Sequence, residues 1–289
     1  MSSPPLRNDA SSSPNALIIG CGYLGQRIAK LWLDSGRTVA ALTRGNGDAL
    51  RTLGVQPLHG DVLDPQTLRE LPKVATVLYA VGLDRTAGRP MREVYVQGLA
   101  NVLDSLPTPE RFLYISSTSV HGQTDGSWVD ETSPTEPLED SGKVVRDAEA
   151  VLRAKLPMAM VLRFAGIYGP NRFLRRAAMF ESGEPITSNP EGFLNLVHVA
   201  DGARAVLEVE TKGSPGETYL VADDEPVKRQ DFYARLAELL RTPGPRFAPS
   251  GKVETNRRIA NRKLRSLGWS PTFPSYREGL MDSLRSHSI

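Results

Sequence analysis

The sequence predicts an α/β fold: a doubly wound parallel sheet covered by helices on both faces, followed by a smaller C-terminal lobe. Three observations predict it. Short apolar segments alternate with helical patterns through the first half of the chain, and a glycine-rich loop joins the first segment to the first helix. Beyond about residue 166 the alternation stops and segments punctuated by proline follow. Strand–helix alternation gives right-handed crossovers and therefore a parallel sheet.

The predicted strands are short apolar segments, as strands buried on both faces require. They lie at 16–20, 38–43, 74–80, 111–116 and 158–163, with a weaker one at 55–59. Apolar residues at helical spacing occupy the stretches between them, at 25–35, 65–71, 90–106 and 141–155. Later, a helix over about 198–210 and a strand over 218–221 have the pattern of sheet-associated elements. We therefore expect the chain to return to the first domain before it completes the second lobe.

The loop after the first strand has the spacing G-x-G-x-x-G, formed by Gly20, Gly22 and Gly25. The first glycine permits a tight turn, the second lets the backbone approach a pyrophosphate, and the third lets the helix pack closely on the sheet. The helix N-terminus adds free N–H groups and the positive end of its dipole. Glycines that serve packing alone are the alternative. We interpret the loop as a dinucleotide site, lined by Gly20, Gly22, Tyr23, Leu24, Gly25, Ala80, Val81, Gly82 and Ser116.

The end of the second strand indicates which nucleotide binds. An acidic residue there normally accepts hydrogen bonds from the adenosine ribose, but this strand ends in Thr43-Arg44. The planar, permanently charged guanidinium of Arg44 suits a 2′-phosphate, which favours NADP(H) over NAD(H). Arg44 as an ordinary surface residue is the alternative. Asp61 and Val62 follow the third strand, where a carboxylate would lie near an adenine amino group; a turn or cap role for Asp61 is the other reading.

Composition excludes several classes of protein. A formal net charge of +2 over 289 residues gives no argument for nucleic acid or an acidic membrane surface. No apolar stretch reaches the roughly 18 residues that would cross a membrane, and no metal-ligand spacing occurs. Cys21 is the single cysteine, which excludes an internal disulfide and fits the cytoplasm. Residues 1–15, rich in Ser and Pro without an apolar centre, are expected to be a disordered tail.

Several further motifs occur in a fixed order along about residues 16–280. They are Gly60-Asp61-Val62-Leu63-Asp64, Gly98-Leu99-Ala100-Asn101-Val102-Leu103, Tyr114-Ile115-Ser116-Ser117-Thr118-Ser119-Val120-His121-Gly122, Leu162-Arg163-Phe164-Ala165-Gly166-Ile167-Tyr168-Gly169-Pro170, Asn195-Leu196-Val197-His198-Val199-Ala200-Asp201 and Leu267-Gly268-Trp269. With the glycine loop, they resemble the extended short-chain dehydrogenase/reductases of the NAD-dependent epimerase/dehydratase type. The resemblance implies a Rossmann-type domain and a small C-terminal substrate domain.

The resemblance also implies a catalytic arrangement that this chain keeps only in part. The family uses a Tyr that exchanges a proton with the substrate, a Lys four residues on, and a Ser or Thr at the end of the fifth strand. Ser117, with Thr118 beside it, is similar to the third element. Counting back from Ala148-Glu149 places Ser141 at the Tyr position and Val145 at the Lys position. The chain therefore resembles an atypical member that lacks the Tyr-x-x-x-Lys pair.

Replacement groups for this pair are few. Tyr168 follows the sixth strand, near the nicotinamide position that the resemblance implies, although a structural tyrosine is the alternative. His121 and His198 could titrate near neutrality, with a helix-capping role as the other reading of His198. The candidate catalytic residues are thus Ser117, Thr118 and Tyr168. The candidate substrate-binding residues are Ser117, His121, Asn195, Arg257 and Arg258, the last two by charge alone.

We expect an NAD(P)-binding domain over 16–165, to which 198–222 return, and a substrate-binding lobe over 166–289. The expected function is that of a cytoplasmic oxidoreductase or epimerase-like enzyme acting on a carbonyl or secondary alcohol of a sugar nucleotide or another hydroxylated small molecule. A non-catalytic NADP(H) sensor is the competing hypothesis, because the Tyr and Lys are absent. The family often dimerises through helices equivalent to 90–106 and 141–155, which leaves a homodimer open by analogy.

Overall fold

The computed structural model describes residues 13–45 and 47–285. Most of the expected N-terminal tail, residues 1–12, lies outside them. Asn15 already belongs to the folded part, because its backbone N–H donates to the carbonyl of Thr38 at 3.0 Å. No helix among the described residues is long and apolar enough to span a membrane.

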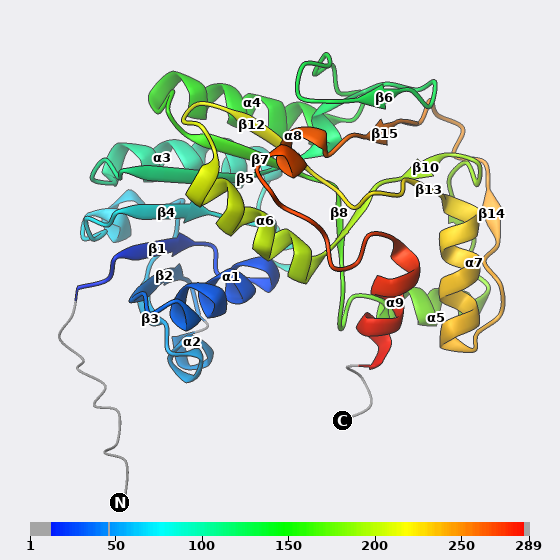
Figure 1. The fold of residues 1–289 in the computed structure, drawn as a ribbon, viewed down its shortest axis with the longest axis horizontal. Helices are drawn as coiled ribbons and strands as arrows, with labels where there is room; N and C mark the ends of the chain where they lie inside the picture. Colours follow the sequence, from blue (N-terminus) through cyan, green and yellow to red (C-terminus); the bar gives the residue numbers. More distant parts are fainter. Residues whose placement is uncertain (1–12, 46, 286–289) are drawn as a thin grey trace, which may run out of the picture.

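A seven-stranded sheet organises the molecule (Figure 1). Its strand order is β12-β7-β5-β4-β1-β2-β3, and every neighbouring pair is parallel. The strands are β1 (Ala16–Ile19), β2 (Val39–Thr43), β3 (Gln56–His59), β4 (Thr76–Tyr79), β5 (Arg111–Ser117), β7 (Met160–Phe164) and β12 (Thr218–Val221). The predicted α/β fold with a doubly wound parallel sheet is confirmed, and 218–221 forms an edge strand of that sheet.

Helices cover both faces of the sheet and create two apolar cores. On one face α1 (Tyr23–Asp34) packs beside α6 (Val199–Lys212), and on the other lie α3 (Gly98–Ser105) and α4 (Asp140–Lys155). Successive side chains of a strand point to opposite faces. In β1, Ile18 therefore enters the core under α1 and α6, while Leu17 and Ile19 enter the other. This is why the strand is apolar at every position.

The helical predictions differ from the structure where short polar segments intervene. The predicted helix 65–71 is only a 3₁₀ turn, Pro65–Leu68, in which the Asp64 side chain accepts a hydrogen bond from the N–H of Gln66. The predicted helix 90–106 is helical from 91 to 105, with a π-helical turn at Glu93–Gln97 before α3. Within the first domain, the short helix α2 (Gly47–Leu53) was not predicted, since it buries a single apolar side chain, Leu50. The helices of the second lobe described below were not predicted either.

The C-terminal lobe has its own aromatic core, which includes Tyr168, Phe173, Phe232 and Tyr276. Three helices surround it, away from the sheet in Figure 1. They are α5 (Leu174–Ser182), α7 (Arg229–Leu240) and α9 (Tyr276–Arg285). The strands of this lobe are β8 (Gly166–Tyr168), β9 (Ile186–Thr187), β10 (Phe193–Leu194), β11 (Leu196–His198), β13 (Val227–Lys228) and β14 (Phe247–Ala248), and β15 (Arg258–Ile259) pairs with β6 (Trp128–Val129). A last short helix, α8 (Arg262–Ser266), returns to the sheet side and buries Leu264 there.

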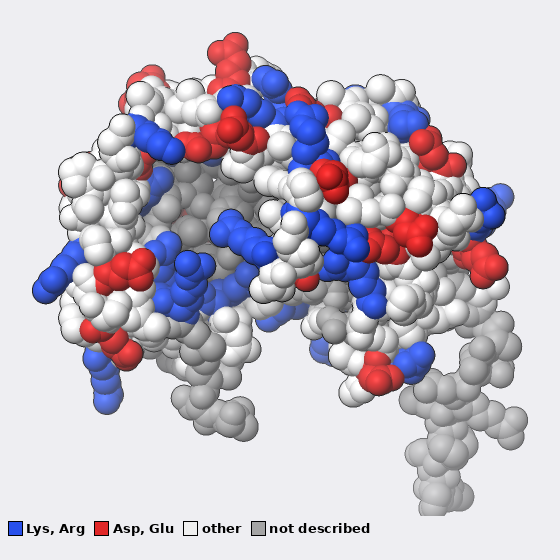
Figure 2. Space-filling view, turned by 180° about the vertical axis from the view of Figure 1, so that it is seen from behind, with Lys and Arg blue, Asp and Glu red and all other residues white. Residues whose placement is uncertain are grey.

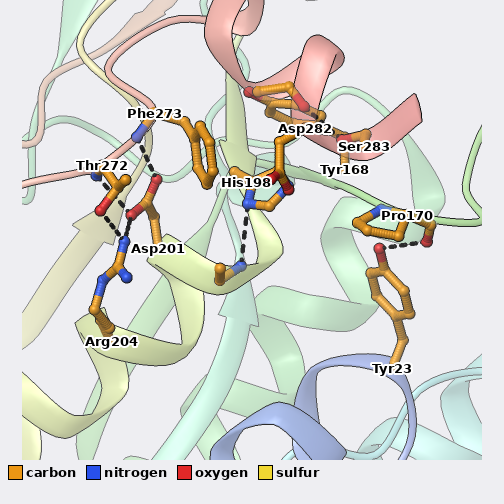
Figure 3. A network of polar contacts seen from close by, with 12 residues as sticks. Tyr23, Tyr168, Pro170, His198, Asp201, Arg204, Thr272, Phe273, Asp282 and Ser283 are labelled. Carbon is orange, nitrogen blue, oxygen red and sulfur yellow. Dashed lines mark hydrogen bonds and ion pairs between the residues drawn. The ribbon is translucent and has the colours of Figure 1, made fainter. Parts of the chain in front are cut away.

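The start of α6 fastens the C-terminal segment to the first domain (Figure 3). The buried carboxylate of Asp201 accepts hydrogen bonds from the backbone N–H groups of Thr272 and Phe273, at 2.7 and 2.9 Å, and pairs with Arg204. His198 caps the helix, because its Nδ1 accepts from the N–H of Ala200 at 3.4 Å, and its ring packs against Phe273. The structure therefore places His198 in the capping role.

Candidate functional site

A cavity of about 860 Å³ lies at the carboxyl ends of the central strands. Figure 2 shows the molecule hollowed on the face opposite to that of Figure 1, with Lys and Arg side chains around the hollow. Ligands of doubly wound sheets bind in the crevice at this end of the strands. The structure brings every sequence-predicted cofactor residue to the cavity wall: Gly20, Gly22, Tyr23, Leu24, Gly25, Arg44, Asp61, Val62, Ala80, Val81, Gly82 and Ser116.

The glycine loop has the geometry that an anion at α1 needs. Gly20 has φ +91°, and a Cβ there would stand 2.7 Å from the backbone of Ala80 and Val81. A Cβ on Gly25 would stand 2.9 Å from the carbonyl oxygen of Gly20, so the helix packs directly on the loop. A Cβ on Gly22 would meet nothing within 4 Å, and Gly22 caps α1 without a side-chain hydrogen bond. The first N–H groups of the helix therefore face open space, which fits a pyrophosphate.

Arg172, which the sequence analysis missed, reaches the cavity from the second lobe. Its guanidinium lies 4.0 Å from the ring centroid of Tyr23, and Arg27 lies 4.1 Å from the same centroid. The Tyr23 hydroxyl donates to the carbonyl of Pro170 at 2.8 Å. Asn171, at φ +67°, makes the turn between them in the left-handed region that Asn tolerates. The loop 169–172 is thus held against the end of the glycine loop through Tyr23. The same loop places the guanidinium of Arg172 at the cavity wall.

Two arginine–aspartate pairs stand at the end of the cavity formed by β2 and β3. Arg44 Nη2 lies 3.1 Å from Asp84 Oδ2, and both side chains are nearly half exposed. Arg89 Nη1 lies 2.7 Å from Asp61 Oδ2, while Asp61 Oδ1 accepts from the N–H of Leu63. Asp61 is therefore both a turn-capping residue and part of the cavity wall, so the two readings of its role from the sequence are compatible.

Ser117 ends β5 and stands where this cavity meets a second one. Its Oγ accepts from the N–H of Ser119 at 3.1 Å. The neighbouring Ser116 hydroxyl donates to Glu149 at 2.5 Å, and Glu149 forms a buried ion pair with Arg163 at 2.7 Å. This ion pair fixes the end of β5 against α4 and β7.

The positions that replace the family's Tyr and Lys differ in their surroundings. Val145 is buried on α4 and forms part of the cavity wall, together with Tyr95 from the π-helical turn. Ser141 is exposed at the first turn of α4 and does not reach that wall. Within the described chain, the two positions therefore place neither a hydroxyl nor an ammonium group in the cavity.

The structure separates Tyr168 from the site, which corrects its assignment as a catalytic residue. The phenol is buried in the core of the second lobe, with its oxygen 3.4 Å from the carbonyl of Ser275 on the side of α9. A Cβ on Gly279 would overlap this oxygen at 1.9 Å, so helix and ring are in direct contact. Burial raises the pKa of Tyr168 far above its usual value, which makes it a poor proton donor. It faces neither cavity.

His121 is likewise misassigned as a substrate-binding residue. Its side chain is fully buried, and its ring nitrogens lie 3.3 Å from the carbonyl of Pro134 and 3.4 Å from Arg163. Burial lowers the pKa of His121 to about 4, so the ring is neutral at physiological pH. His121 supports the loop behind Ser117 and lines neither cavity.

The second cavity, of about 230 Å³, is lined by some of the predicted catalytic and substrate-binding residues. Ser117, Thr118, Asn195 and Arg257 line it. Asn195 holds β15 and the residue before it, since its amide donates to the carbonyl of Arg257 and accepts from the N–H of Ile259.

Arg258 is the remaining predicted substrate residue, and it points elsewhere. Its guanidinium stacks on the rings of Trp128 and Phe193 and donates to the carbonyl of Gly126. It lines neither cavity. Charge alone predicted Arg257 and Arg258 together, but neighbouring residues of an extended segment point in opposite directions.

The wall residues that sequence reasoning missed come from segments far apart in the chain. Arg89 and Arg172 line the larger cavity, and Arg229 lines the smaller one. None belongs to a motif with defined spacing. Their positions depend on tertiary contacts, so composition and periodicity carried no signal for them.

Comparisons with known proteins agree with this geometry. The model of the NAD dependent epimerase/dehydratase family matches residues 16–222. Protein YeeZ of Escherichia coli strain K12 is 30% identical over 274 residues, which are 89% of this chain and 95% of that protein. A 3-diazoavenalumate denitrifying reductase of a Streptomyces species is 28% identical over 156 residues, 48% of this chain and 51% of that one.

Solved structures share the whole fold. One from Methylobacillus flagellatus, described as an NAD-dependent epimerase/dehydratase, has a TM-score of 0.77 at 29% identity and covers 96% of this chain and 100% of its own. The UDP-glucose 4-epimerase of Thermotoga maritima has a TM-score of 0.80 at 18% identity, covering 94% and 98%, and is similar in fold. The matched range begins at β1 and ends just after β12, so it contains every strand of the sheet and the glycine loop. The chain belongs to the NAD-dependent epimerase/dehydratase family.

Proposed function

We propose that the protein is an NADP(H)-preferring oxidoreductase or epimerase-like enzyme acting on a carbonyl or secondary alcohol of a hydroxylated small molecule. One observation carries the proposal: a single cavity runs from the open glycine loop to Ser117 at the end of β5. A dinucleotide held by its pyrophosphate at α1 would have one end near Arg44 and the other near Ser117. Relatives named as reductases and dehydratases support hydride chemistry.

The charges at the cavity wall support the choice of NADP(H). The pair of Arg44 with Asp84 is half exposed, and such pairs contribute little to stability, so a 2′-phosphate can compete for the guanidinium. Arg172 supplies a second cation, beside the glycine loop, where the pyrophosphate would lie. NAD(H) remains the alternative, because it differs from NADP(H) only in lacking the 2′-phosphate, and the rest of the cavity fits both nucleotides equally.

The chemistry at Ser117 is that of a hydrogen-bond donor that holds the substrate oxygen. The bound nicotinamide would supply or accept the hydride. Because Ser117 Oγ accepts from Ser119, its own hydrogen is available to the substrate carbonyl or alcohol. With Val145 at the Lys position and Tyr168 buried elsewhere, the proton that leaves an oxidised alcohol would pass to water in the cavity. We therefore do not assign a phenol to this step.

Arg44→Ala tests the cofactor assignment. In a fluorescence titration of cofactor-free protein, the variant should weaken NADPH binding about 10- to 100-fold, because a charge-assisted phosphate contact is lost. NADH binding should change less than about twofold. Arg51→Ala is the matched control, since Arg51 pairs with Asp48 on α2 and lies outside the cavity wall. Equal losses for both nucleotides would refute the phosphate contact, and no binding of either would refute the proposed function.

Turnover separates an enzyme from a non-catalytic sensor. With a substrate that supports hydride transfer, Ser117→Ala should lower kcat while NADPH binding stays unchanged, because the serine holds the substrate oxygen rather than the nucleotide. The measurement is made over a panel of small hydroxylated and carbonyl compounds. A sensor would bind NADPH and show no Ser117-dependent turnover with any compound of the panel.

A further inference from the structure

The smaller cavity is strongly cationic for its size. It adjoins the nucleotide cavity at Ser117, and its walls come from the ends of β5 and β7, from β10 and from the start of α7. Arg229 and Arg257 both line it, and its wall contains no aspartate or glutamate. Aliphatic, aromatic, hydroxyl and amide groups form the rest. Two guanidinium groups therefore face a small space without an acidic group in its wall.

Arg257 is held in place but not neutralised. One nitrogen, Nη2, donates to the carbonyl of Thr118 at 2.8 Å, which places the guanidinium one residue from Ser117. Its Nε is buried and has no hydrogen-bond partner. No carboxylate of the described chain lies within 4.0 Å of it. Burial, and then the charge of Arg229, lower the pKa of Arg257 to about 10. A partly buried cation with a fully buried, unpaired donor is costly unless a ligand compensates it.

Arg229 is paired with one carboxylate, that of Glu254, which also accepts hydrogen bonds from other groups. Its Nη1 donates to Ser188 Oγ at 2.7 Å and lies 3.4 Å from Glu254 Oε2. Glu254 in turn accepts from the Ser188 hydroxyl at 2.7 Å and from the backbone N–H of Asn189 at 3.0 Å. One carboxylate thus stands against two guanidinium groups, which leaves one positive charge uncompensated.

The size of this cavity limits what can bind. Sites for drug-sized ligands start at about 300 Å³, above the 230 Å³ available here. A sugar nucleotide carries a base, two sugars and a diphosphate, and is larger than that class. A molecule of a few carbons with one anionic group fits the volume of the cavity. Its negative charge would balance the uncompensated positive charge of the arginines.

We propose that this cavity binds the oxyanion of a small substrate, a carboxylate or a phosphate monoester on a skeleton of a few carbons. Arg257, supported by Arg229, holds the oxyanion. The reacting hydroxyl or carbonyl then lies at Ser117, beside the nucleotide cavity. The position of the reacting hydroxyl or carbonyl at Ser117 depends on the proposed function. The assignment of the anion site depends only on the two arginines.

Calorimetric titration of the NADPH-saturated protein tests this proposal with four probes. Glycerol 3-phosphate and D-glycerate share a three-carbon skeleton and differ in their oxyanion, while glycerol is the uncharged counterpart and UDP-glucose the large one. At least one charged three-carbon probe should bind at least tenfold more tightly than glycerol and UDP-glucose. Whether glycerol 3-phosphate or D-glycerate binds more tightly distinguishes a phosphate from a carboxylate site.

Two pairs of variants locate the site. Arg257→Gln should weaken the charged probe about 10- to 100-fold, because a charged hydrogen bond is lost. Arg262→Gln removes the same charge from an exposed position on α8 and should leave the affinity within about twofold. Thr255→Asp, which keeps both arginines, should abolish binding by adding a negative charge to the wall, whereas the neutral Thr255→Asn should retain it.

The outcomes separate this inference from the proposed function. If NADPH does not bind, the proposed function fails, and the probes can still be titrated into the free protein. If NADPH binds but neither charged probe does, the anion site is refuted and the nucleotide site stands. Tighter binding of UDP-glucose, or probe binding that is unaffected by both Arg257→Gln and Thr255→Asp, also overturns the inference.

Discussion

Asp223, just after β12, carries a carboxyl group that the fold buries without a side-chain partner. The residue is 2% exposed, and neither carboxylate oxygen accepts a hydrogen bond of good geometry. Burial raises the pKa of Asp223 from 3.8 to about 8, and the neighbouring carboxylates of Asp224 and Glu225 add to this, while the backbone N–H of Glu225 opposes it. The folded protein therefore holds this group protonated where the unfolded chain ionises it.

The sign of the resulting pH dependence follows from that difference. Between about pH 4 and pH 8 the folded state binds one more proton here than the unfolded state, so the free energy of unfolding falls as the pH rises. Asp223→Asn removes the titration and should stabilise the protein by about 1–3 kcal/mol at pH 8, with a smaller gain at pH 5. Urea unfolding at the two pH values measures it.

The control for this change is Asp34→Asn on α1, which removes a carboxylate from an exposed pair with Lys30. It should show no comparable gain at pH 8. If the difference in free energy of unfolding between Asp223→Asn and the original protein is the same at pH 5 and pH 8, the raised pKa of Asp223 is contradicted.

At the scale of single elements, α4 determines where the loop of Ser117 lies. Gly142, in the first turn of the helix, is in contact with this loop: a Cβ there would stand 2.4 Å from the carbonyl oxygen of Ser119 and 2.7 Å from Pro137. The turn Thr118–Val120 is therefore packed against the helix backbone. Arg257 holds the same turn from the second lobe through the carbonyl of Thr118.

Gly142→Ala should consequently destabilise the protein although alanine is the better helix former. Helix propensity favours Ala by about 1 kcal/mol, whereas the overlap with Ser119 should cost about 1–3 kcal/mol more than that gain. Displacement of the turn should also weaken any ligand held beside Ser117. Chemical unfolding and ligand titration measure the two effects.

Ser141→Ala, at the exposed position just before, is the matched control and should leave both quantities unchanged. An equal or higher stability for Gly142→Ala would mean that the loop moves freely away from α4.

The sequence predicted this sheet better than it predicted the second lobe, for physical reasons. Strands buried on both faces are mostly apolar, so β1, β2, β4, β5 and β7 were visible as apolar segments. The strands of the second lobe, such as β9 and β10, are two residues long, too short to show a period. Tyr168 and His121 were misassigned because a motif gives the position of a residue along the chain and not the direction of its side chain.

At the scale of the whole molecule, the two lobes are joined by buried polar contacts rather than by a hinge alone. Asp201 at the start of α6 is fully buried and binds two backbone N–H groups of the segment that leads to α9 (Figure 3). The indole of Trp269 donates to the Asp201 carbonyl at 3.2 Å. One residue thus orients the last part of the second lobe relative to the sheet.

Asp201→Ala should loosen this junction. Loss of two hydrogen bonds to a buried charge should lower the free energy of unfolding by about 2–4 kcal/mol, and limited proteolysis should cut the segment 270–285 faster. Glu208→Ala, which removes a partly exposed carboxylate farther along the same helix, is the control and should change neither. Unaltered proteolysis of the Asp201 variant would show that apolar packing alone holds the segment.

The path of the chain between the lobes also has a consequence for its synthesis. The apolar core under α1 and α6 includes Ile18 from the first strand and Leu264 and Trp269 from near the carboxyl end. A ribosome that has released only the first 165 residues has supplied neither α6 nor β12. The part of the sheet that α6 covers is then exposed, and the outer edge of β7 has no partner strand. The first domain can reach its final packing only after the chain has been made through Trp269.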